Sequence, residues 1–333
     1  MNSFGRVFRV TLWGESHGNG IGVSVDGVRP GVELTHDDFT FDLERRRSGK
    51  KGTTPRKESD TPRIVSGVFN DHTTGAPLTI VFENENTISK DYSNLTTHFR
   101  PSHADMVADA KYGGWQDYRG GGHFSGRITL PFVAAGVVAK KVLGSKITFQ
   151  SEIVELAGET DSSMFDEIVE RAVKNLDSVG GVIECRIGGI PMGVGEPFFD
   201  SVESVMAHLL FSIPAVKGVE FGAGFDSTRM MGSENNDMIV NSQGATQTNN
   251  SGGINGGIAN GNDIVLRVAV KPTASISSQQ NTYNKTTDSV EPLVIHGRHD
   301  ACIALRAGVV IEAAAAIALA DLMVVGQTPI EKR

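Results

Sequence analysis

The chain has 333 residues, of which 39% are hydrophobic and 21% charged, and it carries a formal net charge of −8. This composition is that of a folded globular protein and excludes general disorder, while the acidic balance argues against nucleic acid as a partner. The longest apolar run, at residues 309–326, is interrupted by Glu312 and Asp321, and the first ten residues lack an apolar signal core. We therefore expect a cytoplasmic protein with no membrane partner.

The first motif, GESHG at residues 14–18, has the G-x-S-x-G spacing of a hydrolase nucleophile elbow and follows a segment that alternates like a strand. A nucleophile elbow joins a strand to a helix. Here Ile21, Val23 and Val25 alternate with small or polar residues, which predicts a second strand, and the nearby glycines disfavour a helix. The motif therefore fits a turn between two strands, and a serine hydrolase using Ser16 is the weakest interpretation.

A charged stretch follows at residues 37–57, which begins with acidic side chains and ends with seven cations in 13 residues. Thr35 is a plausible N-cap, and Phe39 and Leu43 lie four apart, which predicts a helix that the arginines close and a mobile basic loop after it. Cations are common at helix C-termini, so a solvated helix end is one interpretation. The other is an anion site that concentrates a phosphorylated substrate.

The remaining pattern predicts strands and helices in mixed order. Strands are expected at residues 63–70, 77–84, 146–156, 181–190, 217–225 and 263–272. Helices are expected at residues 104–112, 128–142, 164–177, 202–211 and 308–325. Because the strands come in groups, we predict an α+β fold and one domain over residues 1–333. The Asn- and Gly-rich segment 233–263 is either a flexible linker or a functional loop.

Several histidines stand beside Arg, Ser and Gly in short polar turns, where sites are commonly built. A single histidine is more often a hydrogen-bonded structural residue. A metal site made from His17, His103 and His299 is not supported by any H-x-H or H-x-x-x-H pair, so no metal is expected. Cys185 and Cys302 lie in apolar stretches and are expected to be buried, reduced thiols.

Seven motifs, taken together and in order, resemble those of the chorismate synthase family. They are FRVTLWGESHG, DLERRRSG, FRPSHADMVADAKYG, DYRGGGHFSGR, GGINGGIANG, VKPTASI and GRHDACIALRAGVVIEAAAA, over about residues 8 to 315. The resemblance implies a β-α-β sandwich of antiparallel sheets with helices between them, and a homotetramer. It also implies a carbon–oxygen lyase of the shikimate pathway, which makes chorismate from 5-enolpyruvylshikimate 3-phosphate by anti 1,4-elimination of phosphate, using reduced FMN that is not consumed overall.

The resemblance further implies roles for individual residues. His17 would protonate the departing phosphate, His103 would protonate the reduced flavin ring, and Asp300 would help a flavin nitrogen to act as a base. The implied substrate residues, some of which the family also assigns to a nicotinamide phosphate, are Ser16, Arg45, Arg46, Lys51, Arg100 and Arg127. The implied flavin residues are His123, Phe124, Ser125, Pro214, Ala215, Gly256, Lys271, Pro272, Thr273, Ala274, Ser275 and Arg298.

The chain departs from the family pattern at residues 123–129, where HFSGRIT replaces the usual RSSARET. Ser125 and Arg127 remain, so the departure is expected to affect flavin affinity more than catalysis. No long insertion suggests a built-in flavin reductase, so an external reductase is expected, with NADPH as an indirect reductant. The main rival is a non-catalytic protein that binds a sugar phosphate or nucleotide with the same basic loop and glycine-rich segment.

Overall fold

The computed structural model describes residues 1–333 except residues 50, 55–57, 86–96, 296–298 and 326–333. Two antiparallel sheets dominate the described chain. The first has the order β1 (Ser3–Phe4), β2 (Arg9–Gly14), β3 (Gly20–Asp26), β7 (Leu78–Glu83) and β4 (Arg63–Ser66). The second has the order β10 (Val216–Phe221), β13 (Ile264–Val270), β9 (Gly181–Gly188) and β8 (Thr148–Leu156). Five of the six strands predicted after the first two motifs are thus confirmed, whereas the strand predicted at residues 63–70 is divided into β4 and a separate short strand at Val68–Phe69.

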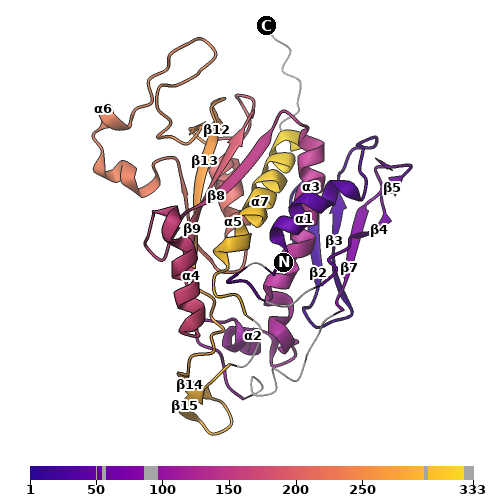
Figure 1. The fold of residues 1–333 in the computed structure, drawn as a ribbon. Coiled ribbons are helices and arrows are strands. Elements are labelled where there is room, and N and C mark those ends of the chain that lie inside the picture. Colours follow the sequence, from indigo (N-terminus) through magenta and orange to yellow (C-terminus); the bar gives the residue numbers. More distant parts are fainter. Residues whose placement is uncertain (50, 55–57, 86–96, 296–298, 326–333) are drawn as a thin grey trace.

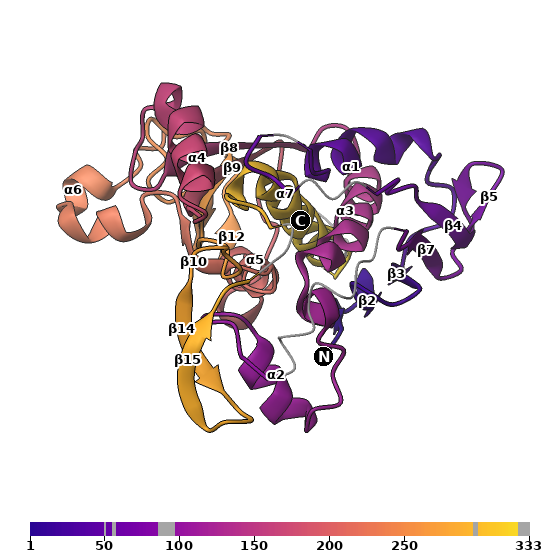
Figure 2. The same ribbon diagram turned by 60° about the horizontal axis from the view of Figure 1, so that its bottom comes forward.

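The helices complete a layered arrangement (Figures 1 and 2). They are α1 (Thr40–Arg46), α2 (Asp105–Tyr112), α3 (Thr129–Leu143), α4 (Phe165–Lys174), α5 (Val202–Leu210), α6 (Gly232–Asn235) and α7 (Ala304–Val325). Helix α3 packs on β3 and β7 of the first sheet, α7 packs on β8 and β9 of the second, and α3 and α7 pack on each other. The expected α+β fold, with helices between two antiparallel sheets, is confirmed.

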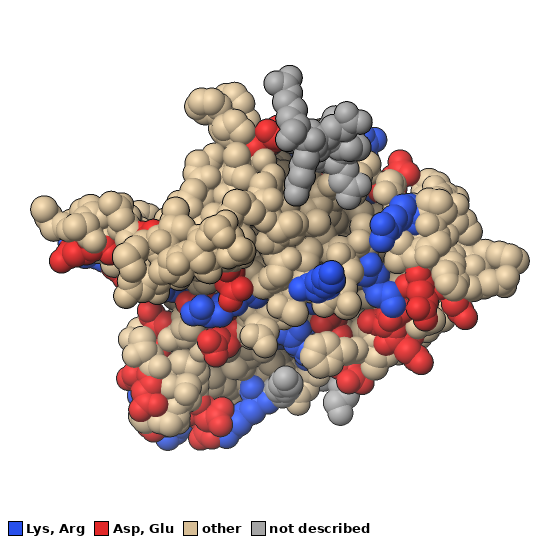
Figure 3. All heavy atoms as spheres, turned by 90° about the horizontal axis from the view of Figure 1, so that it is seen from above, with Lys and Arg blue, Asp and Glu red and all other residues tan. Residues whose placement is uncertain are grey.

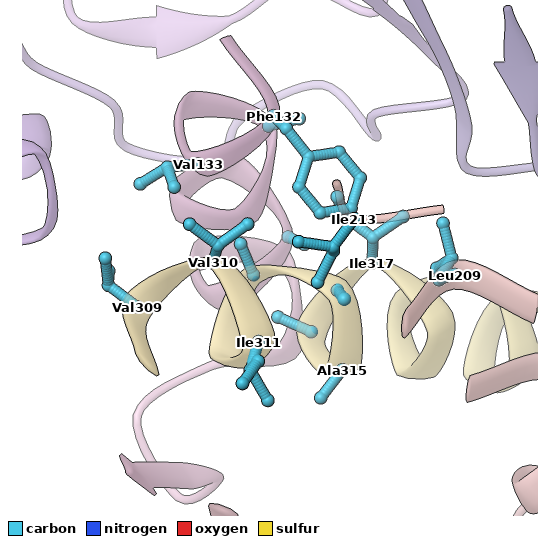
Figure 4. Packing of buried hydrophobic residues seen from close by; sticks show 14 of the residues in the cluster. Phe132, Val133, Leu209, Ile213, Val309, Val310, Ile311, Ala315 and Ile317 are labelled. Carbon is cyan, nitrogen blue, oxygen red and sulfur yellow. The ribbon is translucent and has the colours of Figure 1, made fainter. Parts of the chain in front are cut away.

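The sequence explains why each layer buries the face that it does. In β7, Leu78, Ile80 and Phe82 are buried while the residues between them are partly exposed, which is the period of two that directs one face of a sheet to the core. In α7, every residue from 309 to 322 is buried, which is typical of a central helix. Figure 4 shows Phe132 of α3 and Leu209 of α5 on one side of this helix.

Helix α7 is long and apolar enough to cross a membrane, judged by length and composition alone. Most of it is buried inside the protein, so its apolar composition is accounted for by its place between α3, α5 and the second sheet. Its two acidic residues, Glu312 and Asp321, have hydrogen-bond or ion-pair partners there. Asp321 accepts hydrogen bonds from the backbone N–H groups of Arg6, Val7 and Phe8, and Glu312 binds cationic side chains of α1 and α3.

Helices α3 and α7 approach each other very closely at Gly136 and Ala313. A Cβ atom built on Gly136 would lie 2.3 Å from the Cβ atom of Ala313 and 2.6 Å from its Cα atom, so this position has no room for a side chain. The crossing of the two central helices therefore depends on a glycine.

Gly136→Ala is expected to lower the free energy of unfolding by about 1–3 kcal/mol, the usual cost of overpacking a core. Chemical denaturation measures the change. Gly232→Ala is the matched control, because a Cβ atom at Gly232 meets nothing within 4 Å. Equal stability of the two variants would show that α3 and α7 tolerate a wider separation.

Some element boundaries differ from the prediction. Thr35 does not cap a helix: a 3₁₀ turn at Asp37–Phe39 precedes α1, and Asp38 accepts hydrogen bonds from the Thr35 N–H and O–H groups instead. Helix α4 stops at Lys174, because Leu176 adopts a left-handed φ of 56°. Helix α7 begins at Ala304, four residues earlier than predicted.

The sequence patterns also missed several small elements. The Asn- and Gly-rich segment is folded rather than a linker, since it contains α6 and the hairpin of β11 (Ile254–Asn255) and β12 (Ile258–Ala259). Two further two-stranded pairs join β5 (Val68–Phe69) to β6 (His72–Thr73) and β14 (Gln280–Asn284) to β15 (Ser289–Leu293). Both cysteines are buried and free, as predicted.

Candidate active site

A cavity of about 740 Å³ lies beside the two central helices. Part of its wall is apolar and is made by core residues of α3, α5 and α7, including Phe132, Leu209 and Val310. The rest comes from polar loops that are far apart in the sequence. This size is within the range of about 300–1,000 Å³ that is usual for small-molecule sites.

Most of the predicted site residues line this cavity. They are Ser16, His17, Arg46, Arg100, His103, His123, Phe124, Ser125, Arg127, Pro214, Ala215, Lys271, Pro272, Thr273, Ala274, Ser275 and Asp300. The fold thus brings together residues from six of the seven motifs. That they share one cavity is observed; the chemical role of each stays a prediction.

The GESHG turn joins β2 to β3, so the strand–helix geometry of a nucleophile elbow is absent. A glycine loop supports the turn: the Ser16 N–H donates to the Gly122 carbonyl at 3.1 Å, and His123 Nδ1 donates to the Gly14 carbonyl at 2.8 Å. Gly120 has a φ of 58°, and a Cβ atom there would lie 2.6 Å from Cδ2 of the His17 ring. The position of His17 therefore depends on a residue without a side chain at 120.

His103 belongs to a partly buried hydrogen-bonded group at the start of α2. Asp105 accepts from His103 Nδ1 at 2.7 Å, and from Nε and Nη2 of Arg100 at 2.7 Å each. Burial alone would raise the pKa of Asp105, but these hydrogen bonds hold it well below its usual range. Burial lowers the pKa of His103, against the opposing effect of Asp105. At neutral pH the ring is therefore neutral, with its proton on Nδ1 and its lone pair on Nε2.

The lowered pKa of His103 predicts a loss of stability in acid. Above the unfolded pKa of about 6.5 the ring is neutral in both states and contributes nothing. As the pH falls below that value, the unfolded chain binds a proton before the folded chain does, so the free energy of unfolding decreases. His103→Gln should lose less stability than the wild type between pH 7.5 and 5.5, measured by denaturant titration. His72→Gln, at an exposed position of β6, should behave as the wild type does.

A group of buried cations lies at the polar end of the cavity. Arg127 is paired with Asp60, and Arg46 lies 3.7 Å from the same carboxylate. Arg46 and Arg127 have only 4% and 8% of their surface exposed. One buried carboxylate thus faces two buried guanidinium groups, which leaves excess positive charge for an anionic ligand.

Arg46 is held in place by neutral acceptors as well. Its Nε atom donates to Thr129 Oγ1 at 3.0 Å and its Nη2 atom to the Gly126 carbonyl at 2.9 Å. Burial, and then the charge of Arg306, lower the pKa of Arg46 to about 9. The side chain is therefore a fixed cation at neutral pH.

On the face drawn in Figure 3, Lys and Arg side chains lie interspersed with Asp and Glu, and large areas carry neither. The basic run predicted as an anion site is divided in the structure: Arg46 lines the cavity, whereas Arg45 and Lys51 do not. Arg45 binds Glu312 with Nη1 at 2.8 Å and Nη2 at 2.5 Å.

The other predicted residues outside the cavity lining also have local explanations. Lys51 is exposed and paired with Glu170 of α4. Gly256 lies in the two-residue turn between β11 and β12, where its φ of 60° favours glycine. Arg298 lies outside the described residues. The basic loop is anchored where it is described, since the Gly52 carbonyl accepts from the Ala301 N–H at 2.9 Å.

Sequence reasoning missed three residues that shape the polar end. Asp60 is buried between the guanidinium groups, Thr54 donates its backbone N–H to Asp300 Oδ1 at 2.8 Å, and Arg306 donates to Asp300 Oδ2 at 2.6 Å. No local pattern marks the first two. Arg306 stands in the motif that contains Asp300, six residues further on, and could have been proposed from its place in the first turns of a helix.

Comparisons with known proteins identify the family of the chain. The model of the chorismate synthase family matches residues 8–324. The chain is 59% identical over 327 residues to chorismate synthase of Chitinophaga pinensis, with 98% of each chain covered, and 44% identical over 349 residues to that of Dehalococcoides mccartyi, with 96% of each covered. A structure titled as the crystal structure of chorismate synthase matches with a TM-score of 0.75 at 26% identity, covering 98% of this chain and 94% of that one. The chain therefore belongs to the chorismate synthase family.

Proposed function

We propose that the protein converts 5-enolpyruvylshikimate 3-phosphate to chorismate and phosphate by anti 1,4-elimination, as a carbon–oxygen lyase of the shikimate pathway. The observation that carries the proposal is that His17, His103 and Asp300 line the same cavity as the buried guanidinium groups of Arg46 and Arg127. A phosphate and two carboxylates make this substrate strongly anionic. Arg46 and Arg127, which share one carboxylate counterion, are suited to bind it.

His17 is the residue that we assign to the leaving phosphate. Its side chain lines the cavity, is mostly buried, and is held against the glycine loop. A histidine can hold or release a proton near neutral pH, and a positioned proton donor accelerates such a step by about 10²–10⁴-fold. A noncatalytic binding protein would not need this arrangement.

The cavity also fits reduced FMN, which the family implies. Thr273, in the predicted flavin segment, lines the cavity, and its Oγ1 atom is buried without a hydrogen-bond partner among the described residues. We assign the flavin contacts to this segment, residues 271–275, and to Ser125 and Ala215 on the same cavity. When bound, reduced FMN would supply an electron as the phosphate leaves and would recover it when the ring hydrogen is lost. His103 offers its Nε2 atom as the site that holds or passes a proton.

The assembly and supply of reductant follow from family membership. We infer a cytoplasmic homotetramer that receives reduced flavin from an external reductase, with NADPH as the indirect reductant. Phe198 and Phe199 support subunit contacts, since their exposed fractions are 84% and 91%. Apolar side chains so fully exposed are typical of interaction surfaces.

An anaerobic assay tests the proposed function. Purified protein, chemically reduced FMN and 5-enolpyruvylshikimate 3-phosphate are mixed, and the absorbance of chorismate is followed. Product should form with reduced FMN and not with oxidised FMN. Absence of product with reduced flavin, or equal product with oxidised flavin, would contradict the proposal. Binding of sugar phosphates without turnover would instead favour a non-catalytic protein, and hydrolysis of an activated ester would favour the serine hydrolase.

A further inference from the structure

We infer that Arg306 is a positioning residue for Asp300, and that substrate binding transfers its guanidinium group from Asp300 to an anionic group of the substrate. This inference rests on the proposed function, which supplies the substrate. Helix α7, which carries Arg306, would then contribute to substrate binding as well as to the hydrophobic core.

The starting point is that both oxygens of the Asp300 carboxylate are engaged. Oδ1 accepts from the Thr54 N–H at 2.8 Å, and Oδ2 accepts from Arg306 Nη2 at 2.6 Å. The Asp300 and Arg306 side chains are 10% and 18% exposed. A pair so shielded from water holds its geometry and its charge more firmly than a surface pair does.

The Arg306 guanidinium group makes fewer hydrogen bonds than the guanidinium group of Arg127 does. Arg127 is bound by Asp60, Asn84 and the Glu83 carbonyl. Arg306 makes one side-chain hydrogen bond within the described part of the chain, to Asp300. Its positive charge also repels that of Arg46, and this repulsion lowers the pKa of Arg46. A second anion in the cavity would therefore compete with Asp300 for this cation.

The transfer changes the chemistry of Asp300. While Arg306 is paired with it, both oxygens of the Asp300 carboxylate are occupied by hydrogen-bond donors. Once Arg306 binds the substrate, Asp300 keeps the Thr54 N–H and its Oδ2 atom is free to accept a new hydrogen bond. Among the described residues, the charged and titratable groups that face Asp300 include Arg306 from α7, Arg46 from α1 and Cys302 two residues further on. Substrate binding thus prepares the aspartate that the reaction is proposed to use.

A double-mutant cycle on binding tests the inference without turnover. Affinity for 5-enolpyruvylshikimate 3-phosphate is measured by calorimetry with FMN kept oxidised, for the wild type, Arg306→Gln, Asp300→Asn and the double variant. Arg306→Gln should weaken binding about 10- to 100-fold, as expected for loss of a charge-assisted hydrogen bond. Asp300→Asn should strengthen it by about three- to tenfold, because Arg306 no longer leaves a counterion. The double variant should match Arg306→Gln, since the effect of Asp300→Asn requires Arg306.

The controls separate this inference from simpler explanations. If Asp300→Asn also strengthened substrate binding in the Arg306→Gln variant, Asp300 would repel the substrate directly. That result would overturn the inference. Unchanged affinity in Arg306→Gln would overturn it as well. The same two substitutions in the exposed pair of Arg229 and Asp226, which lies outside the cavity lining, should change nothing.

Folding of the variants is checked by thermal unfolding and circular dichroism. If Arg306→Gln is unfolded, Arg306→Lys takes its place, because it keeps the charge and loses the planar fork. Binding to Arg306→Lys should be weaker than to the wild type, and Asp300→Asn should still strengthen it. An Asp300→Asn effect of zero there would overturn the inference. A wild type that does not bind the substrate at all would contradict the proposed function and, with it, this inference.

Discussion

His17→Ala is expected to lower kcat by about 10²–10⁴-fold, the contribution of a positioned general acid. The leaving phosphate would then depart without a proton donor, while the guanidinium groups that bind the substrate remain in place. KM should therefore change much less than kcat. Anaerobic turnover with reduced FMN measures both quantities, and circular dichroism verifies the fold.

Two further variants show whether the ring itself is responsible. Gly120→Ala keeps His17 but displaces its ring, because the added Cβ atom would lie 2.6 Å from it, so kcat should fall there too. His36→Ala changes an exposed histidine outside the cavity lining and should leave kcat unaltered. If His17→Ala turned over at nearly the wild-type rate, His17 would be a structural residue of the turn.

Glu312→Ala is expected to lower the free energy of unfolding by up to about 3–5 kcal/mol, the usual cost of breaking a buried ion pair. Glu312 is 1% exposed and accepts hydrogen bonds from Arg45, from Lys140 at 3.0 Å and from Ser151 at 2.7 Å. Burial alone would raise its pKa, but the bonds from Arg45 lower it. Denaturant titration measures the loss at neutral pH.

The matched control is Glu170→Ala, which removes an exposed carboxylate that pairs with Lys51. Exposed ion pairs contribute about 0–1 kcal/mol to stability, so this change should alter the free energy of unfolding very little. Similar losses in the two variants would contradict the view that Glu312 ties α1, α3 and α7 together. Unaltered substrate affinity in a folded Glu312 variant would agree with a structural rather than a binding role for Arg45.

Periodicity predicted the layers well, because burial imposes the same spacing on the sequence as on the structure. The alternation in Leu78–Glu83 and the apolar run of α7 are direct consequences of their neighbours. Boundaries were less predictable, since they depend on individual groups. Asp38 and the left-handed Leu176 decide where helices begin and end, and neither leaves a periodic signal.

The sequence predicted which kinds of residue form the site, but not which of them pair with one another. The motifs identified many of the residues that line the cavity, including His17 and His103. It could not distinguish Arg45 from Arg46, which are adjacent in sequence yet face Glu312 and Asp60 respectively. Successive residues of a helix point in different directions, and their partners lie at unrelated separations along the chain: Glu312 is 267 positions from Arg45, whereas Asp60 is close to Arg46 in sequence.

Ligands are expected to enter the cavity through its loops rather than by parting of the two sheets. Each sheet is packed on one central helix, and these helices meet where not even a methyl group fits between Gly136 and Ala313. Hinged opening would have to separate this contact and expose core side chains. Entry should therefore depend on motions of the loops that line the cavity, on about the nanosecond to microsecond scale, rather than on slower domain motions.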